Sequence, residues 1–595
     1  MLRKLFLLVI LILLGVALFL NPNFKTISAG VAILLFGMIM LEDGFKEFTK
    51  GPLQKILKNA TSRLYKSIPV GAFVTALLQS SSLVSVITIS FISAGLISLS
   101  GGLGLIFGAN IGTTATAWLV AVFGLNIKIS ALAMPMLIFG IIFSFQKTNS
   151  LKGIGNILAG LGFFFLGIHF MKDGFDVFKE YIDLTEYAVS GFLGVIIYCF
   201  LGIVITTILQ SSSATLALIL TALAAGQIEY ENALALAIGA NIGTTITAIL
   251  GSLTANVAGK RLAGAHLVFN FATGIVALVF IYPLADLVDY LSILFGIGAK
   301  EFILKLALFH TIFNVIGVII MLPFIKLLEK VLLKIFKERQ DRDVDEPKYL
   351  NESVLEFPES TISALLKESE YLFQNAIFEI VAHALNIHRS DIISEEKIKK
   401  VVKKSKKDMK TNVDELYYRK VKKIYGKIIL FASKGQSMLL MTEGQNKLIS
   451  QIKTANRIMV EIIREIEELG KNVSKYQNSD NVHIQKKYNK FRKKIATVLR
   501  LIHLFSKEEL RDTYYHKLAG LKEEAKQEIH QNNESIDQLI RENLITIDMG
   551  SSLVNDNDHV NSTIKKLITV AELLYGKTDT LLENGVPQKN LETIQ

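Results

Sequence analysis

The chain has 595 residues, which is too long for one compact domain. It carries 64 Lys and Arg against 53 Asp and Glu, but residues 1–325 hold only 18 of these basic side chains and 13 of the acidic ones. So long an apolar first part excludes a wholly soluble protein, and the single cysteine excludes an intramolecular disulfide framework. The basic excess is typical of loops beside anionic lipid. The sequence has no concentrated basic stripe of the kind that would indicate a nucleic-acid partner.

The chain begins with MLRKLFLLVILILLGVALFL, a short basic stretch followed by an apolar run. This pattern resembles a signal peptide, but a clear cleavage site of small residues is missing and another apolar run follows at once. We interpret it as a retained first membrane helix, with cleavage as the alternative.

Further apolar runs follow in chain order, and about 20 residues suffice to cross a bilayer core of roughly 30 Å. With the first helix, the expected spans lie near residues 5–20, 28–41, 101–124, 129–145, 154–171, 232–253, 262–285 and 302–325. Two more runs, 68–98 and 191–226, are interrupted by a polar cluster. Such a break is tolerated at membrane depth only inside protein or beside a cavity, so these runs are predicted to be re-entrant, broken helices.

The region that contains these breaks is duplicated. FGMIMLEDGF at 36–45 matches LGIHFMKDGF at 166–175, QSSS at 79–82 recurs at 210–213, and GANIGTT at 108–114 recurs at 239–245. Three ordered matches with a nearly constant offset indicate internal duplication. We therefore predict repeat 1 at about 28–145, repeat 2 at about 154–285, and a final helix at 302–325, together forming a membrane domain at 1–325.

Loop charge predicts that the two repeats have opposite orientations. Residues 42–67 carry six basic side chains and three acidic ones, whereas the matching stretch 172–186 carries two lysines and five acidic side chains. Because positive loops stay in the cytoplasm, the first loop and the region after residue 325 are expected inside and the second loop outside. The result is an inverted repeat, an architecture common in secondary transporters. A parallel duplication is the alternative, and it would put one loop on the wrong side.

The densely charged remainder of the chain is predicted to be helical. After a linker at 326–350, a bundle at 351–595 is expected because apolar residues recur at helical spacing. This spacing occurs in segments 359–387, 396–440, 442–470, 482–508, 511–544 and 557–584. The expected fold class is all-α: a polytopic membrane protein with two inverted repeats that contain broken helices, joined to a cytoplasmic helical bundle.

The polar breaks form a candidate binding site, because serine hydroxyls can donate to phosphate oxygens or offer lone pairs to a cation, and glutamine can do both. Serine favours helix N-termini, and a half-helix that begins there directs free N–H groups and its positive dipole end toward the break. An inverted repeat would bring both breaks together near the membrane midplane. The candidates are Gln79, Ser80, Ser81, Ser82, Gln210, Ser211, Ser212 and Ser213. The alternative is that these small polar residues only allow close helix packing.

The GANIGTT copies supply oxygen atoms, the ligands that hard cations prefer. They contribute Asn110, Thr113, Thr114, Asn241, Thr244 and Thr245. Residues 71–126 contain no charged side chain, and residues 192–259 contain only Glu229 and Glu231. A phosphate anion buried among neutral groups needs a countercharge. We therefore expect a co-bound sodium ion, with binding of anion and cation mutually dependent.

Two QSSS motifs, each followed by GANIGTT, resemble the sodium-dependent phosphate cotransporter family, bacterial relatives of the type II sodium–phosphate cotransporters, over about residues 30–320. The resemblance implies sodium-coupled transport of inorganic phosphate across the bacterial inner (plasma) membrane. HLVFN at 266–270 and HTIFN at 310–314 resemble paired helices of that family, which makes Asn270 and Asn314 further sodium candidates. For His266 and His310 we expect packing roles rather than a proton relay.

The tail resembles PhoU, a helical-bundle regulator linked to phosphate uptake, most clearly in YLNESVLEFPESTISALLKESEYLFQNA at 349–376. This resemblance implies a regulatory domain. No cofactor is expected besides sodium as the coupling ion, and no transition metal is assigned. The expected partners are inorganic phosphate, sodium and the lipid bilayer, with a homo-oligomer left open.

Two other functions stay open from the sequence. The first is a membrane phosphate sensor that signals through the bundle without transport. The second is an enzyme acting on lipid-linked phosphate, which would need a base or a metal ligand beside the serines. The charge-free stretches argue against an enzyme. The intact motifs in both copies argue for transport, because a sensor needs binding but not access from both sides, so we expect a transporter. Uptake and efflux share the same motifs, so the direction of transport stays open.

Overall fold

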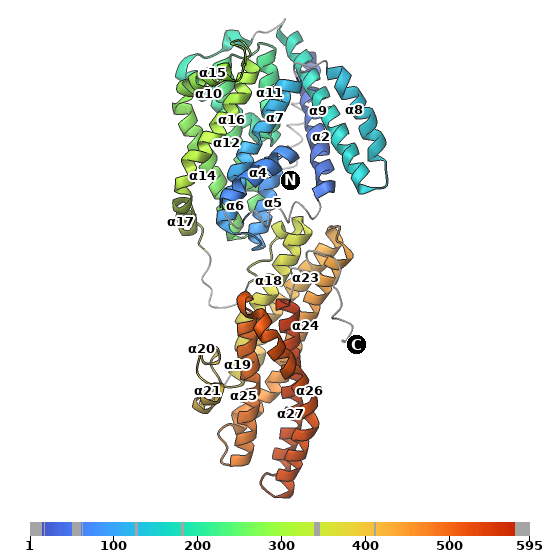
Figure 1. Cartoon of the computed structure of the whole chain (residues 1–595), viewed down its shortest axis with the longest axis vertical. Helices are drawn as coiled ribbons and strands as arrows, with labels where there is room; N and C mark the ends of the chain where they lie inside the picture. Colours follow the sequence, from blue (N-terminus) through green and yellow to red (C-terminus); the bar gives the residue numbers. More distant parts are fainter. Residues whose placement is uncertain are drawn as a thin grey trace. The chain divides into compact units, whose positions relative to one another are not determined.

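The computed structural model describes residues 15–16, 18–49, 61, 64–124, 129–179, 184–337, 346–409 and 412–576. Every regular element within these ranges is a helix, as predicted. The chain divides into Met1–Glu338, called here the membrane unit, and Arg339–Gln595, called the bundle unit (Figure 1).

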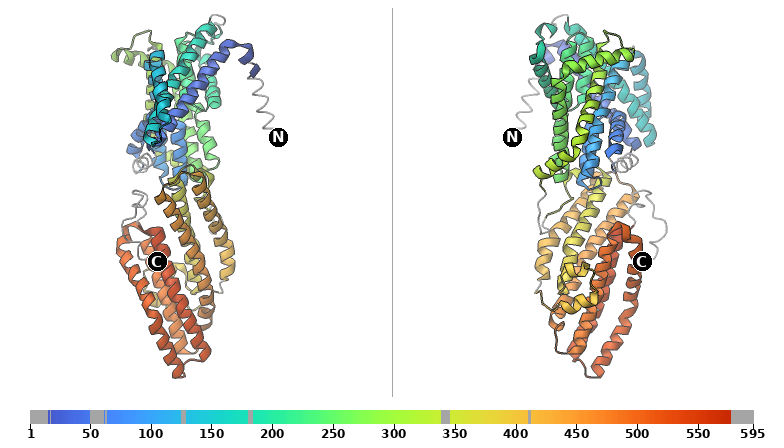
Figure 2. Two further views of the ribbon diagram at one scale, coloured as in Figure 1. Left: turned by 90° about the vertical axis from the view of Figure 1, so that its right-hand side faces the viewer. Right: turned by 60° about the vertical axis from the view of Figure 1, so that its left-hand side comes forward.

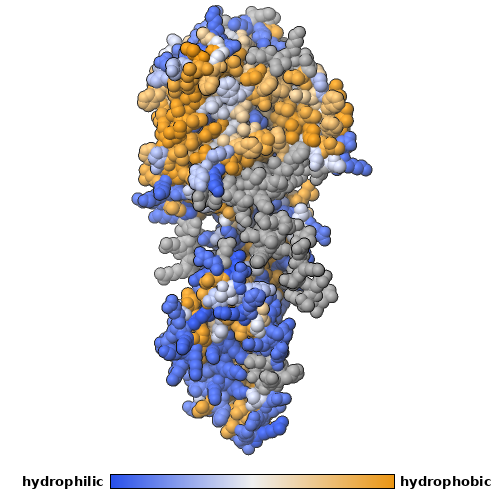
Figure 3. Space-filling view, viewed as in Figure 1, coloured by the Kyte–Doolittle hydropathy of each residue, from blue (hydrophilic) through white to orange (hydrophobic). Residues whose placement is uncertain are grey.

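The membrane unit is built from apolar helices, and seven helices of the described chain are long and apolar enough to cross a membrane. On the face shown in Figure 3, much of the coloured surface of this unit is apolar. Most of the first predicted span, 5–20, lies outside the described residues. The elements are α2 (Pro22–Thr49), α4 (Leu64–Leu78), α5 (Ser81–Ser93), α6 (Leu99–Gly112), α7 (Thr114–Leu119), η1 (Val120–Gly124), α8 (Ile129–Ser144), α9 (Asn149–Lys179), η2 (Leu184–Tyr187), α10 (Gly191–Leu209), α11 (Ser212–Ala224), α12 (Tyr230–Gly243), α13 (Thr245–Ser252), α14 (Val257–Val279), α15 (Ile281–Leu294), α16 (Phe302–Met321), η3 (Leu322–Phe324) and α17 (Ile325–Ile335).

Both interrupted runs are broken helices, as predicted. The first run stops at Leu78 and restarts at Ser81, and the second stops at Leu209 and restarts at Ser212. The breaks therefore occur at matching positions of the two repeats. The following helices, α6 and α12, also begin and end at matching positions.

The duplication extends to tertiary contacts. A Cβ atom on Gly108 of α6 would lie 2.0 Å from the carbonyl oxygen of Ile68 on α4. A Cβ atom on Gly239 of α12 would lie 2.0 Å from the carbonyl oxygen of Cys199 on α10. Since no side chain fits at either position, the two helix pairs can approach this closely only through glycine. The same contact is thus built twice.

Helices α2 and α9, the first helices of the two repeats, run antiparallel. Gly37 of α2 meets Gly160 of α9, and Gly30 meets Gly167, so that a lower number on one helix pairs with a higher number on the other. A Cβ on Gly37 would lie 2.6 Å from the Gly160 carbonyl oxygen, and one on Gly30 would lie 2.8 Å from that of Gly167. Gly30 of repeat 1 corresponds to Gly160 of repeat 2 in the alignment of the repeats, and Gly37 corresponds to Gly167. The two glycine contacts are therefore equivalent, because each becomes the other when the repeats are exchanged. The two helices therefore pack through a symmetric, antiparallel glycine contact.

The membrane unit continues past the predicted boundary at 325. Helix α17 occupies the start of the region predicted as a linker, 326–350, and the chain divides at Glu338. Leu328 and Leu332 of α17 are buried. The guanidinium of Arg261 on α14 donates to the carbonyl oxygen of Phe336 from Nε at 3.0 Å and from Nη2 at 2.7 Å. These contacts hold α17 on the membrane unit, because its apolar face and its C-terminal carbonyl group are both satisfied there.

The bundle unit is helical throughout its described part, and its long helices α24 to α27 run side by side (Figure 2). Ile452, Met459, Ile466 and Val473 of α24 are buried at a regular heptad spacing, as a packed helix face requires. The elements are η4 (Glu352–Glu356), α18 (Pro358–Leu372), η5 (Phe373–Ile377), α19 (Phe378–Ala384), α20 (Arg389–Ile393), α21 (Ile398–Lys404), α22 (Val413–Leu416), η6 (Tyr417–Val421), α23 (Lys422–Met438), α24 (Glu443–Tyr476), α25 (Val482–Phe505), η7 (Glu508–Leu510), α26 (Arg511–Arg541) and α27 (Ile547–Tyr575).

Candidate functional site

Each break has the same backbone geometry. Gln79 and Gln210 both have φ of 53°, a left-handed conformation that residues other than glycine rarely adopt. Ser80 and Ser211 follow in extended conformation and cap the next half-helix. The N–H of Leu83 donates to Ser80 Oγ, and the N–H of Ala214 donates to Ser211 Oγ, both at 3.2 Å. Strained backbone repeated at matching positions points to a functional requirement there.

The two half-helices leave donors directed at the breaks. The first N–H groups of a helix have no acceptor within that helix. In α5 and α11 these groups belong to Ser81, Ser82, Ser212 and Ser213, whose hydroxyl groups can also donate. A helix N-terminus with free N–H groups is a binding site for anions, because the helix dipole adds a partial positive charge.

Two threonines bring the breaks together. Thr116 Oγ1 lies 2.8 Å from Gln79 Oε1 in the first break and 3.1 Å from Ser213 Oγ in the second. Thr247 is the counterpart of Thr116 in the second repeat, and its Oγ1 lies 3.3 Å from Ser82 Oγ. The Thr116–Ser213 and Thr247–Ser82 contacts are therefore counterparts. One hydrogen-bonded polar cluster thus contains side chains from both breaks.

The site is neutral and partly enclosed. Ser212 and Ser213 are each 5% exposed, Ser81 and Ser82 are half-buried, and Gln210 is exposed. None of the side chains in this hydrogen-bonded set carries a charge. An anion held here would meet only dipoles, since hydroxyl, amide and N–H groups supply no net countercharge.

The GANIGTT threonines contact their own helices. The hydroxyls of Thr113 and Thr244 donate to the carbonyl oxygens of Asn110 and Asn241. Those of Thr114 and Thr245 likewise donate to carbonyl oxygens one helical turn earlier, at 2.7 and 2.8 Å. A hydroxyl that donates its proton keeps its lone pairs, so these four oxygens are still able to bind a cation.

The four candidate asparagines are buried, but they are linked in only one repeat. Asn241 Nδ2 donates to Asn314 Oδ1 at 2.7 Å, and His310 Nε2 lies 3.0 Å from Asn241 Oδ1. Asn110 instead donates to the carbonyl oxygen of Ile106 at 3.0 Å. Asn270 donates to the carbonyl oxygen of His266 at 3.1 Å, in its own helix.

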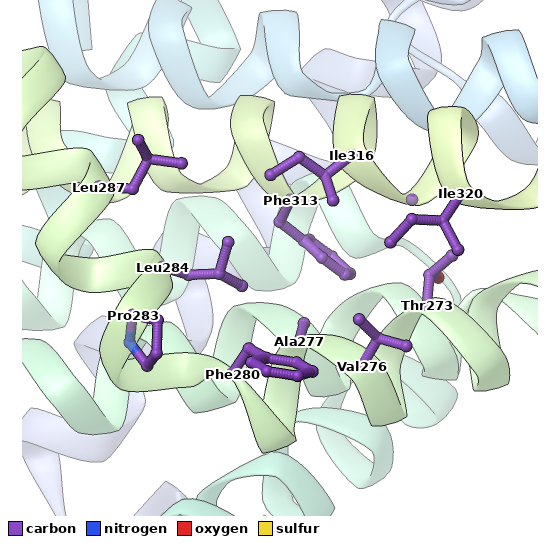
Figure 4. Close-up of a pocket in the computed structure, with 11 residues that line it drawn as sticks. Thr273, Val276, Ala277, Phe280, Pro283, Leu284, Leu287, Phe313, Ile316 and Ile320 are labelled. Carbon is purple, nitrogen blue, oxygen red and sulfur yellow. The ribbon is translucent and has the colours of Figure 1, made fainter.

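Two of the cavities in the described part of the membrane unit are lined mostly by apolar side chains. A cavity of about 590 Å³ between α4, α6 and α7 is lined by Thr114 and Trp118, among mostly apolar residues. A second cavity, of about 330 Å³, lies between α14, α15 and α16, where apolar side chains such as Phe280 and Phe313 point toward one another (Figure 4). The hydroxyl of Thr273, which lines the second cavity, donates to the carbonyl oxygen of Phe269, so this cavity is not the polar site.

Sequence reasoning missed Thr116 and Thr247. Each stands shortly after a GANIGTT motif, at the same place in both copies. That shared place was the available signal, because a polar residue kept in both copies of a charge-free stretch is a candidate for the same site. Their contacts with the opposite repeat could not be read from the motif.

Comparison with known proteins finds similar proteins for the membrane unit. The family model described as Na+/Pi-cotransporter matches residues 33–173 and 190–321. The "Putative inorganic phosphate export protein YjbB" of Salmonella typhimurium strain LT2 is 29% identical over 341 residues, which are 57% of this chain and 61% of the relative. The protein with the same name from Escherichia coli strain K12 is 27% identical over 342 residues, again 57% and 61%.

A third relative, the "Uncharacterized protein YqeW" of Bacillus subtilis strain 168, is 29% identical over 315 residues, which are 51% of this chain and 95% of that protein. The chain thus spans 61% of the length of the relatives named for phosphate export. No solved structure matches the chain. The matched residues include both breaks and both GANIGTT motifs, so over these residues the membrane unit is similar to the Na+/Pi-cotransporter family.

Proposed function

We propose that this protein is a secondary active transporter that moves inorganic phosphate together with sodium. The observation that carries the proposal is the Thr116 hydroxyl, which contacts Gln79 of one break and Ser213 of the other. Through this contact, two half-helix N-termini that begin in opposite repeats serve one site. Transport requires a site that can be reached from both sides of the membrane, and a site shared between two repeats can be opened by moving one repeat against the other.

Phosphate is held by the two breaks. The N–H groups and hydroxyls of the serines donate to its oxygens, and the glutamine amides orient it. The proposed phosphate-binding residues are Gln79, Ser80, Ser81, Ser82, Gln210, Ser211, Ser212 and Ser213. Ser80 and Ser211 act through the backbone, because their hydroxyls already cap the half-helices.

Sodium supplies the countercharge. The polar site holds no basic side chain, so the anion needs a cation bound close to it. The proposed ligands are the oxygen atoms of Asn110, Thr113, Thr114, Asn241, Thr244, Thr245, Asn270 and Asn314. Because each ion stabilises the other, the affinity for phosphate should rise with sodium and the affinity for sodium should rise with phosphate by the same factor.

The two repeats are proposed to be inverted, and the antiparallel contact of α2 with α9 supports this. The bundle unit is proposed to be a cytoplasmic, PhoU-like regulator in a protein of the bacterial plasma membrane. Two of the relatives are named for phosphate export. Net export coupled to sodium would require sodium to leave the cell as well, so the gradients that act on the protein decide the direction.

The proposal is tested with purified protein in proteoliposomes. Flux of radiolabelled phosphate should follow an imposed sodium gradient and stop when choline replaces sodium. Ser81→Ala combined with Ser212→Ala should abolish phosphate binding in a folded protein, whereas Ser144→Ala on α8 serves as a matched control. Flux that is equal in sodium and choline would contradict sodium coupling. Sodium-dependent binding without flux would instead indicate a phosphate sensor.

A further inference from the structure

Two helices, α14 and α16, carry His and Asn one turn apart, and both pack against α6 and α12. Helix α16, with His310 and Asn314, contacts α12, and helix α14, with His266 and Asn270, contacts α6. The asparagine of each GANIGTT motif lies on the contacted helix. Helix α14 also contacts α5, as α16 contacts α11, so the two sets occupy corresponding places: Asn241 with Asn314, and Asn110 with Asn270.

Asn241, Asn314 and His310 are joined by hydrogen bonds. Asn241 Nδ2 donates to Asn314 Oδ1 at 2.7 Å, and Asn241 Oδ1 lies 3.0 Å from His310 Nε2. Asn314 Nδ2 donates backward to the carbonyl oxygen of His310 at 2.8 Å. These three residues are between 2% and 3% exposed, so water does not compete for the bonds.

The set that contains Asn110 and Asn270 differs in the orientation of one side chain, that of Asn110. Asn270 Nδ2 donates to the carbonyl oxygen of His266, as Asn314 does to that of His310, so Asn270 holds the same pose as its counterpart. Its Oδ1 is buried and has no hydrogen-bond partner. Asn110 would be the donor, but its amide turns to the carbonyl oxygen of Ile106. The helices are already adjacent here, since the Phe107 and Phe269 rings stack at 4.3 Å between centroids.

We propose that the two asparagine pairs are alternating latches. The Asn241–Asn314 latch is closed in the conformation described here. The Asn110–Asn270 latch closes in the conformation that faces the other side of the membrane, and the Asn241–Asn314 latch then opens. This inference rests on the proposed transport function.

Exchange of the latches keeps the two conformations close in free energy. Each conformation contains one closed latch and one asparagine amide turned to its own helix, so the number of buried hydrogen bonds does not change. A transporter needs such a balance, because a large difference would leave one conformation almost unpopulated. Asparagine suits this role because its amide both donates and accepts.

A second difference between the repeats is found at the breaks. Gln79 accepts a hydrogen bond from Thr116, whereas Gln210, its counterpart, is exposed and among the described residues has no side-chain hydrogen bond. Both the latch and the glutamine thus differ between repeats with matching sequences. Two independent differences are expected when inverted repeats adopt different conformations within one transporter.

The first test is a pair of double-mutant cycles on the thermal unfolding of the full chain. Asn241→Ala and Asn314→Ala should each lower Tm by about 1–3 °C, and the double variant should lose little more than one single variant, because both remove the same bond. Asn110→Ala and Asn270→Ala should be additive. Coupling in both pairs, or in neither pair, would overturn the proposal.

The second test counts disulfides in a chain in which the native cysteine is changed by Cys199→Ala. Two chains carry one pair each, Asn241→Cys with Asn314→Cys or Asn110→Cys with Asn270→Cys, and oxidation should cross-link each pair. A chain with all four cysteines should form one disulfide per molecule. Two disulfides per molecule, or no cross-link in the Asn110→Cys, Asn270→Cys chain, would overturn the latch. Neither measurement uses transport, so absence of phosphate flux would count against the proposed function alone.

Discussion

Removal of the Thr116 hydroxyl by Thr116→Val tests the link between the two breaks. Thr116 is 1% exposed, and valine keeps its β-branched shape. The change removes the contacts to Gln79 Oε1 at 2.8 Å and Ser213 Oγ at 3.1 Å. Each lost neutral hydrogen bond contributes about 1 kcal/mol, and a buried partner left unpaired adds to the loss. Because both partners are proposed phosphate ligands, a total of about 2 kcal/mol should raise the Kd for phosphate about thirtyfold.

The measurement is calorimetric titration of phosphate into the purified chain in sodium, with Tm as the check on folding. Thr247→Val is the matched control. Its single contact across the repeats, to Ser82, is longer at 3.3 Å, and its hydroxyl already donates to the carbonyl oxygen of Thr244 at 2.7 Å. We therefore expect a smaller effect, tenfold or less by the same arithmetic. Wild-type affinity in folded Thr116→Val, or a larger loss in Thr247→Val, would refute the reasoning.

Three further predictions concern stability. Gly108→Ala and Gly239→Ala should each sharply reduce the folded yield in membranes, measured by size-exclusion chromatography, because a Cβ would lie 2.0 Å from a helix carbonyl oxygen. Burial raises the pKa of Glu368 in the bundle from 4.5 to about 7. Ionisation of this carboxyl therefore destabilises the folded bundle as pH rises through this range. Glu368→Gln should raise Tm at pH 8, and this gain should be lost by pH 5. The buried Arg492 guanidinium donates to four carbonyl oxygens. Arg492→Lys should therefore lower the free energy of unfolding of the bundle, measured in urea, by about 3 kcal/mol. Arg464→Lys, at an exposed position, should leave it unchanged.

Much of the fold could be predicted because its signals are local. Helical segments follow from apolar spacing, and the broken helices follow from QSSS inside apolar runs. The boundary at 325 was less accurate, since α17 continues the membrane unit to Ile335. Its apolar face predicted a helix in isolation, but the contact of Arg261 with Phe336 that holds it in place joins residues 75 positions apart. A contact at that separation has no signature in the local pattern.

The site was predicted only in part, for a related reason. A motif shows which residues recur, and so it gave the serines, glutamines and asparagines as candidates. It does not show which recurring residue meets which partner, so Thr116 and Thr247 were missed although they stand beside the motifs. The different hydrogen-bond partners of the Asn110 and Asn241 amides could not be predicted either, because the two motifs have the same sequence and the structure places their side chains differently.

By itself, the amino-acid order determined that this is an apolar, duplicated, helical chain with two polar breaks and no charge beside them. Hydropathy, repetition and charge are properties of short segments, and each can be read where it occurs. The tertiary structure alone decided that the breaks meet through Thr116, that the first helices of the repeats cross antiparallel through glycines, and that two sequence-identical motifs make different hydrogen bonds. These features depend on atoms far apart in the chain, whose distances are set only when the helices pack.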